Sequence, residues 1–146
     1  MFKHILIPTD GSTIALKAAR AGIRFAAESG ARVTVFHAIE QWRPAYISPD
    51  LASSRTFVDF DRLARERGAA EVAAVAKLAE AAGVPFASLV SKSGAPYEAI
   101  AEAARKRKCD LIWMASHGRR GVARVMMGSV TLKVLAHATV PVVVYR

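Results

Sequence analysis

The sequence contains a single cysteine, Cys109, so no intramolecular disulfide can form. A lone cysteine is typical of proteins from reducing compartments. We therefore expect a domain that is held together by its hydrophobic core. Because no histidine lies near Cys109 in the sequence, we interpret it as a structural or incidental thiol.

Long apolar runs are also missing. None reaches the roughly 18 residues that a membrane span requires, and the first residues lack the apolar centre of a signal peptide. The hydrophobic content of 53% nevertheless excludes a disordered chain. A length of 146 residues suits one compact domain, so we predict a single domain over residues 1–146, with no membrane span and in the cytoplasm.

Acidic residues are scarce, with 12 Asp and Glu against 21 Lys and Arg, and the net charge is +9. This excess attracts nucleic acid, anionic lipid or phosphorylated ligands. The densest basic run, residues 105–108, lies at the predicted end of a helix, where each cation is favoured by about 0.3–1 kcal/mol. No aromatic residues alternate with that run, as stacking on bases would need, so nucleic-acid binding remains only an alternative.

Short apolar segments alternate with alanine-rich segments along the whole chain. Helices are expected at about 12–28, 56–82, 96–108 and 128–138, and strands at 4–8, 32–39, 86–92, 110–115 and from Val140 to Arg146. Strict alternation predicts an α/β fold with one parallel sheet and helices on both faces. A long loop from Glu40 to Arg55, with Trp42 and Tyr46, is predicted to be either a binding segment that closes over the site or a disordered segment.

Two loops carry the residues that indicate a function, one after the first strand and one after the fourth. This placement favours the strand order 3-2-1-4-5, a doubly wound, Rossmann-like sheet with a ligand site between the first and fourth strands. The first loop reads "PTDGS". The Asp10 carboxylate there can accept hydrogen bonds from ribose hydroxyls or a base amine, while Gly11 lets a ligand approach the backbone. The alternative is that Asp10 caps the next helix, in competition with Ser12 and Thr13.

The second loop reads "ASHGRRGVARVMMGSV". Nine residues separate Gly118 from Gly128 and Ser129, where the last helix is expected to begin. Backbone N–H groups, a helix N-terminus and the Ser129 hydroxyl would then face one anion, which predicts a phosphate site. The alternative is a simple loop before a capped helix. Arg119, Arg120 and Arg124 either reach phosphate oxygens or are merely solvated.

Taken together, these segments make the sequence resemble the universal stress protein family. Its "HILIPTDGS", "FHAI", "ASHGRRGVARVMMGSV" and "PVVVYR" segments match that family's landmarks in order, over nearly the whole chain. The family's nucleotide motif is Gly, two residues, Gly, nine residues, then Gly with Ser or Thr. Here Ala115 stands at the first glycine, and the added methyl group is compatible with the motif if φ stays below zero there.

The resemblance implies a site for ATP, or for AMP or ADP, with Mg²⁺ accompanying the nucleotide. Asp10 would bind the ribose, Ala38 would lie by the adenine through its backbone, and Met114 and Ala115 would flank the sugar and α-phosphate. Further implied contacts are Pro8 and Thr9 on the adenosine, and Gly118, Gly128, Ser129 and Val130 on the phosphate chain.

The implied function is that of a dimeric stress-response regulator or sensor. The strand from Val140 to Arg146 would lie at a sheet edge, and two copies could pair there across a two-fold axis. An alternative is the same fold without nucleotide, acting as a dimeric module that binds protein partners. Because the sequence has no Walker segment and no kinase signature, we expect at most slow ATP hydrolysis.

Overall fold

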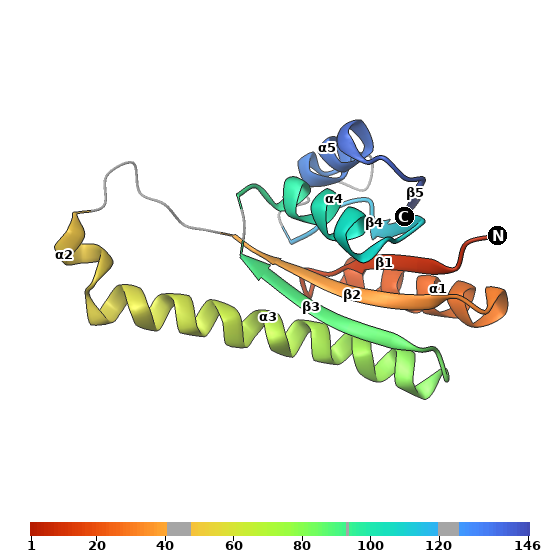
Figure 1. Cartoon of the computed structure of the whole chain (residues 1–146), viewed down its shortest axis with the longest axis horizontal. Helices are drawn as coiled ribbons and strands as arrows, with labels where there is room; N and C mark the ends of the chain where they lie inside the picture. Colours follow the sequence, from red (N-terminus) through yellow and green to blue (C-terminus); the bar gives the residue numbers. More distant parts are fainter. Residues whose placement is uncertain (41–47, 93, 120–125) are drawn as a thin grey trace.

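The computed structural model describes residues 1–40, 48–92, 94–119 and 126–146. Its five strands form one parallel sheet in the order β3-β2-β1-β4-β5 (Figure 1). The strands are β1 (His4–Pro8), β2 (Arg32–Ile39), β3 (Phe86–Lys92), β4 (Leu111–Ala115) and β5 (Val142–Tyr145). The predicted fold class and strand order are confirmed.

Helices cover both faces of the sheet. The bounds are α1 (Thr13–Ser29), α2 (Pro49–Ala52), α3 (Arg55–Ala81), α4 (Pro96–Arg107) and α5 (Ser129–His137). Helices α1 and α3 pack against one face, whereas α4 and α5 pack together against the other (Figure 1). This division follows from the strand order, because the chain crosses from one side of β1 to the other between β3 and β4.

The alternation of side chains along the strands produces two cores. On one face Ile5, Ile7 and Val35 pack with α1 and α3, and on the other Leu6, Phe36 and Ile112 pack with α4 and α5. These strand residues are fully buried, and burial of each such side chain stabilises the fold by about 1.5–3 kcal/mol. The sheet is therefore a rigid support for the loops at its carboxyl edge.

Some predicted bounds need correction. The loop expected from Glu40 to Arg55 contains the one-turn helix α2, because the Ser48 side chain accepts the Leu51 N–H and Pro49 stands at the first helical position. Helix α3 also begins at Arg55, inside that loop. Residues 41–47, with the predicted closing segment's Trp42 and Tyr46, lie outside the described part of the chain.

Two strands are shorter than predicted. β4 begins at Leu111. Asp110, just before it, donates its main-chain N–H to the His4 carbonyl, and its side chain accepts the main-chain N–H groups of Lys3 and His4. β5 begins at Val142 rather than Val140, because the intervening Pro141 has no N–H to donate.

Helix α3 is longer than the sheet beneath it. Its 27 residues bury only Gly68, Val72, Val75 and Ala79, all in the second half. In the first half, Val58, Phe60 and Leu63 are each more than half exposed. Figure 1 shows these first turns extending past the end of β3 toward α2.

Candidate functional site

The carboxyl ends of β1 and β4 lie side by side in the middle of the sheet. The chain leaves β1 toward α1 on one face, and it reaches α5 on the other face after β4 (Figure 1). Doubly wound sheets bind ligands at such a switch point. The structure thus brings Pro8, Thr9 and Asp10 to the same edge as Met114 and Ala115, as the strand order predicts, and Ala38 lies near the end of the neighbouring strand β2.

Asp10 connects the two loops. One carboxylate oxygen accepts the main-chain N–H of Ser12 at 2.9 Å, and the other accepts that of Arg119 at 2.9 Å. Burial by itself would raise the pKa of Asp10, but the hydrogen bonds from Ser12 and Arg119 outweigh burial and hold that pKa below its ordinary value. Asp10 is therefore a carboxylate at neutral pH. Because a carboxylate has about four acceptor positions, Asp10 can accept further hydrogen bonds.

The alternative that Asp10 caps α1 is wrong. The N-cap is Ser12, whose side chain accepts the Ala15 N–H at 3.2 Å. Asp10 lies two residues before the cap, and its carboxylate instead joins the two loops.

Gly118 lies directly against Asp10. A Cβ atom built on Gly118 would stand 2.2 Å from Asp10 Oδ2, which no side chain can do without displacing the carboxylate. The close approach of the second loop to the first therefore requires glycine at this position.

The N-terminus of α5 is open to an anion. The helix begins at Ser129 after the N-cap Gly128, and no side chain of the described residues caps it. The Gly128 N–H donates to the Ser116 carbonyl at 2.7 Å, and the Thr131 hydroxyl donates to the Ala115 carbonyl at 3.0 Å. These two bonds fix the start of α5 beside the end of β4. The helix dipole and the N–H groups of its first turn, which have no acceptor within the helix, favour a negative charge there.

Ser129 and Val130 open this helix, Ser129 being exposed and Val130 half-buried. Arg120 and Arg124 lie outside the described residues, in the interval 120–125. Arg119 is described, and its guanidinium donates to Glu71 on α3.

Ala115, which replaces the motif's first glycine, is compatible with the backbone. It is the last residue of β4, and among the described non-glycine residues only Lys108 has a positive φ. The methyl group is buried, with 8% of the residue exposed. The substitution therefore does not strain the loop.

Two residues at this edge were not among the predicted site residues, Glu71 on α3 and His37 on β2. Glu71 Oε1 pairs with the Arg119 guanidinium at 2.6 Å, and His37 Nδ1 lies 2.9 Å from the Thr9 carbonyl oxygen. A signal for Glu71 was present, because it falls on the helical stripe formed by Gly68, Val72 and Val75, where a charged side chain is unusual.

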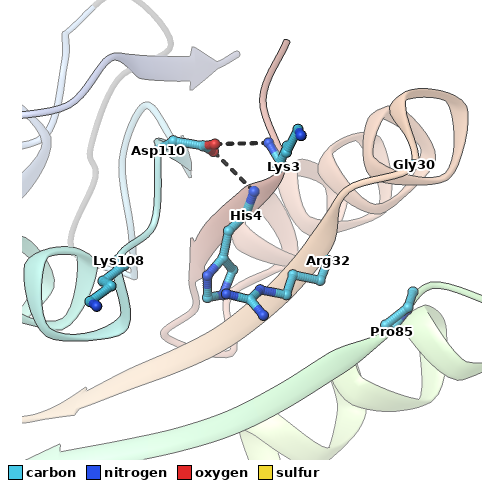
Figure 2. Close-up of a pocket in the computed structure, with 7 residues that line it drawn as sticks. All are labelled: Lys3, His4, Gly30, Arg32, Pro85, Lys108 and Asp110. Carbon is cyan, nitrogen blue, oxygen red and sulfur yellow. Dashed lines mark hydrogen bonds between the residues drawn. The ribbon is translucent and has the colours of Figure 1, made fainter.

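A basic pocket lies at the amino ends of the strands, opposite the candidate site. It measures about 380 Å³, and Figure 2 shows its lining residues, Lys3, His4, Gly30, Arg32, Pro85, Lys108 and Asp110. Helices α1 and α4 end there, at the C-caps Gly30 and Lys108. Cations favour such helix ends, so we attribute this charge to helix stabilisation.

None of the helices in the described part of the chain is both long and apolar enough to cross a membrane.

Comparison with known proteins agrees with this geometry. The model of the universal stress protein family matches residues 1–146. A universal stress protein from Thermus aquaticus is 37% identical over 146 residues, which cover the whole of both chains. Universal stress protein MJ0531 of Methanocaldococcus jannaschii is 34% identical over 148 residues, which cover 100% of this chain and 83% of the relative.

Solved structures share the architecture. That of universal stress protein UspA from Lactobacillus plantarum is 25% identical and has a TM-score of 0.81, covering 99% of this chain and 98% of its own. Two less similar structures were solved with nucleotides. One is a universal stress protein in complex with cAMP (22% identity, TM-score 0.72, covering 99% of this chain and 97% of its own). The other is an Arabidopsis thaliana family protein with AMP bound (18% identity, TM-score 0.67, covering 97% and 90%).

The family model spans every residue, and relatives keep more than 30% identity over the full length of this chain. With its sheet order and its two loops at the switch point, the chain belongs to the universal stress protein family.

Proposed function

We propose that this protein binds ATP, or AMP or ADP, between the loops after β1 and β4, and that it acts as a dimeric stress-response regulator in the cytoplasm. One observation carries the proposal. The carboxylate of Asp10 and the uncapped N-terminus of α5 lie on adjacent loops that a hydrogen bond from Arg119 to Asp10 holds together. A group that accepts from ribose and a group that attracts phosphate thus share one edge of the sheet.

The roles follow from position. Asp10 would accept the ribose hydroxyls, while Pro8, Thr9 and the backbone of Ala38 would line the adenosine. Met114 and Ala115 would flank the sugar, and the phosphate chain would lie along Gly118 and Gly128 to the first turn of α5 at Ser129 and Val130. The two family structures solved with cAMP and AMP support an adenine nucleotide as the ligand.

Mg²⁺ would enter with the nucleotide. Among the described residues no three His, Cys, Asp or Glu side chains gather as a metal site. In nucleotide sites Mg²⁺ is usually held by phosphate oxygens and water with only one or two carboxylates, so we propose that the phosphates would supply most of its ligands. We propose that binding, rather than rapid hydrolysis, is the function of the site.

Thermal unfolding with and without ATP and Mg²⁺ tests the proposal. At 100 times the dissociation constant a ligand stabilises the folded state by about 2.7 kcal/mol, which raises the Tm by about 5–10 °C for a domain of this size. Asp10→Asn should lose most of this shift, because the ribose loses its charged acceptor while the side-chain volume is kept.

Asp110→Asn is the matched control. Asp110 also accepts two main-chain N–H groups, those of Lys3 and His4, but it does so at the opposite edge of the sheet. This variant should have a lower Tm and yet keep the full shift with ATP. The absence of a shift in the wild type would contradict nucleotide binding and would favour a module that binds only protein partners.

We further propose that β5 pairs with β5 of a second copy. In the sheet order β5 is an edge strand bonded only to β4. The carbonyls of Pro141 and Tyr145 accept N–H groups from the β4 side. Because backbone groups alternate sides along a strand, those of Val144 point away from β4, toward the open edge.

Val144→Pro therefore tests the dimer. Proline would remove an outward N–H without breaking the ladder to β4, and edge strands tolerate it. We expect a dimer for the wild type in multi-angle light scattering and a folded monomer for the variant. A wild-type monomer, or a Val144→Pro protein that is still dimeric, would contradict this arrangement.

A further inference from the structure

Arg119 makes two contacts, one through its main chain and one through its side chain. The proposed nucleotide site uses only the first of them. Its main-chain N–H donates to Asp10 Oδ2 at 2.9 Å. Its guanidinium donates to Glu71 Oε1 at 2.6 Å, across 48 residues of sequence. The ion pair thus links α3 to the loop after β4, next to Asp10 of the proposed nucleotide site.

The backbone is shaped to admit this ion pair. A Cβ atom on Gly11 would lie 2.7 Å from Glu71 Cδ and 2.8 Å from Arg119 Nη2. Gly11 also has φ +77°, a conformation that favours glycine. One turn earlier on α3, a Cβ atom on Gly68 would lie 2.7 Å from His37 Cδ2. Glycine at these two positions lets α3 come close enough for Glu71 to reach Arg119 above the first loop.

Glu71 depends on Arg119 for charge compensation. The Glu71 side chain is only 10% exposed, whereas that of Arg119 is 50% exposed. Glu71 Oε2 lies 2.9 Å from His37 Nδ1, but that nitrogen lies equally close to the Thr9 carbonyl oxygen, and Oε2 has no hydrogen-bond partner among the described residues. Removal of the guanidinium would leave a largely buried carboxylate poorly paired, which is costly.

Arg119 is also close to the proposed phosphate position. It follows Gly118 and lies two residues after His117, whose Cα is 3.1 Å from where a Gly128 Cβ would stand. Since an extended chain advances about 3.3–3.6 Å per residue, the main chain of Arg119 starts within roughly 10 Å of the start of α5. An arginine side chain that left Glu71 could meet a phosphate bound at that helix.

We propose that Glu71 is a specificity-determining residue that competes with the ligand's phosphates for the Arg119 guanidinium. This inference rests on the proposed nucleotide site and adds a selectivity to it. A phosphorylated ligand must draw Arg119 from Glu71 or bind without it, and in either case its affinity is lowered. A nucleoside carries no phosphate and is indifferent to the pair. Glu71 thus weakens ATP and AMP relative to adenosine.

Titration calorimetry of Glu71→Gln with ATP and with adenosine tests the proposal. Glutamine keeps the volume of the side chain but no longer holds the cation by charge. For a half-exposed arginine that gains a phosphate partner, we expect ATP affinity to rise about threefold to tenfold. Adenosine affinity should stay within about twofold, so the ratio of the two affinities is the quantity to measure.

Two further proteins make the result specific. Arg119→Ala in the Glu71→Gln background should return ATP affinity to near the wild-type value, since the main-chain bond from residue 119 to Asp10 does not need the side chain. Glu66→Gln, which removes an exposed carboxylate from the same helix, should leave both affinities unchanged.

The outcomes separate this proposal from the one on which it rests. If the wild type binds ATP and Glu71→Gln weakens ATP and adenosine equally, Glu71 only supports the structure and the proposed competition is wrong. An unchanged ratio has the same meaning. If neither protein binds either ligand, the nucleotide site itself is refuted, and the competition with it.

Discussion

The contact between Gly118 and Asp10 predicts that Gly118→Ala destabilises the protein only while the Asp10 carboxylate is present. In Gly118→Ala the new methyl group would overlap Asp10 Oδ2, at 2.2 Å. The carboxylate must then move, and at least its bond from the Arg119 N–H, now 2.9 Å, is lost. A hydrogen bond to a charged group is worth about 1.5–3 kcal/mol. Because Asp10 is only half-buried, we expect a loss of about 1–2 kcal/mol.

Removal of the carboxylate should reverse this effect. The φ angle of Gly118 is not in the positive range, so alanine can adopt it, and a compatible Gly-to-Ala change stabilises by about 0.4–1 kcal/mol through the unfolded state. In an Asp10→Ala background Gly118→Ala should therefore be neutral or stabilising. Apart from chain neighbours, the described atoms within 4 Å of the added Cβ all belong to Asp10.

Urea unfolding of the four proteins of this double-mutant cycle, followed by circular dichroism at pH 7, measures the coupling. We expect a coupling free energy of about 1.5–3 kcal/mol between the two positions. Equal destabilisation by Gly118→Ala in both backgrounds would show that the loop does not lie on Asp10, and it would remove the geometric basis of the proposed site.

Two further predictions concern buried titratable groups away from the site. Burial raises the pKa of the Cys109 thiol to about 11, so the folded protein at pH 8 should not react with a disulfide reagent that labels the denatured protein fully; rapid labelling would show that the thiol is accessible. Burial, followed by the charge of Arg32, lowers the pKa of His4 below its ordinary 6.5. The unfolded chain therefore takes up a proton before the folded one does as the pH falls below 6.5, and stability should decrease there. His4→Gln should lose less stability than the wild type between pH 7.5 and pH 5.5 in urea titrations, and equal losses would mean that other groups cause the decrease.

The fold could be predicted from the sequence because its signals are local. Short apolar segments alternate with helical ones, and the two loops with Asp10 and Gly118 favour one strand order, which the structure confirms. That order alone is enough to bring the first and fourth strands together. Errors arose at element ends, where a single group decides the boundary, such as the missing N–H of Pro141 before β5 or the Ser48 side chain that begins α2.

The partners of Arg119 could not be predicted in the same way. From the sequence Arg119 is expected either to bind phosphate or to be solvated, whereas its side chain pairs with Glu71, 48 positions earlier in the chain. That contact depends on how closely α3 passes over the first loop, and the approach is set by the tertiary packing of Gly68 against His37. No periodicity within either segment encodes that distance.

The length of α3 has a consequence for how the molecule opens locally. A helix of 27 residues is about 40 Å long, but the 7 residues of β3 span only about 23 Å. The first turns of α3 therefore extend past the sheet, and they are supported by pairs within the helix such as Arg62 with Glu66 and by the pair of Asp61 with Lys92 at the end of β3. A helical stretch this short is only marginally stable in water by itself. Its amides should therefore exchange with deuterium through local fraying. From Gly68 onward exchange should require unfolding of the whole domain. The limit of the cooperative unit thus passes through the middle of one unbroken helix.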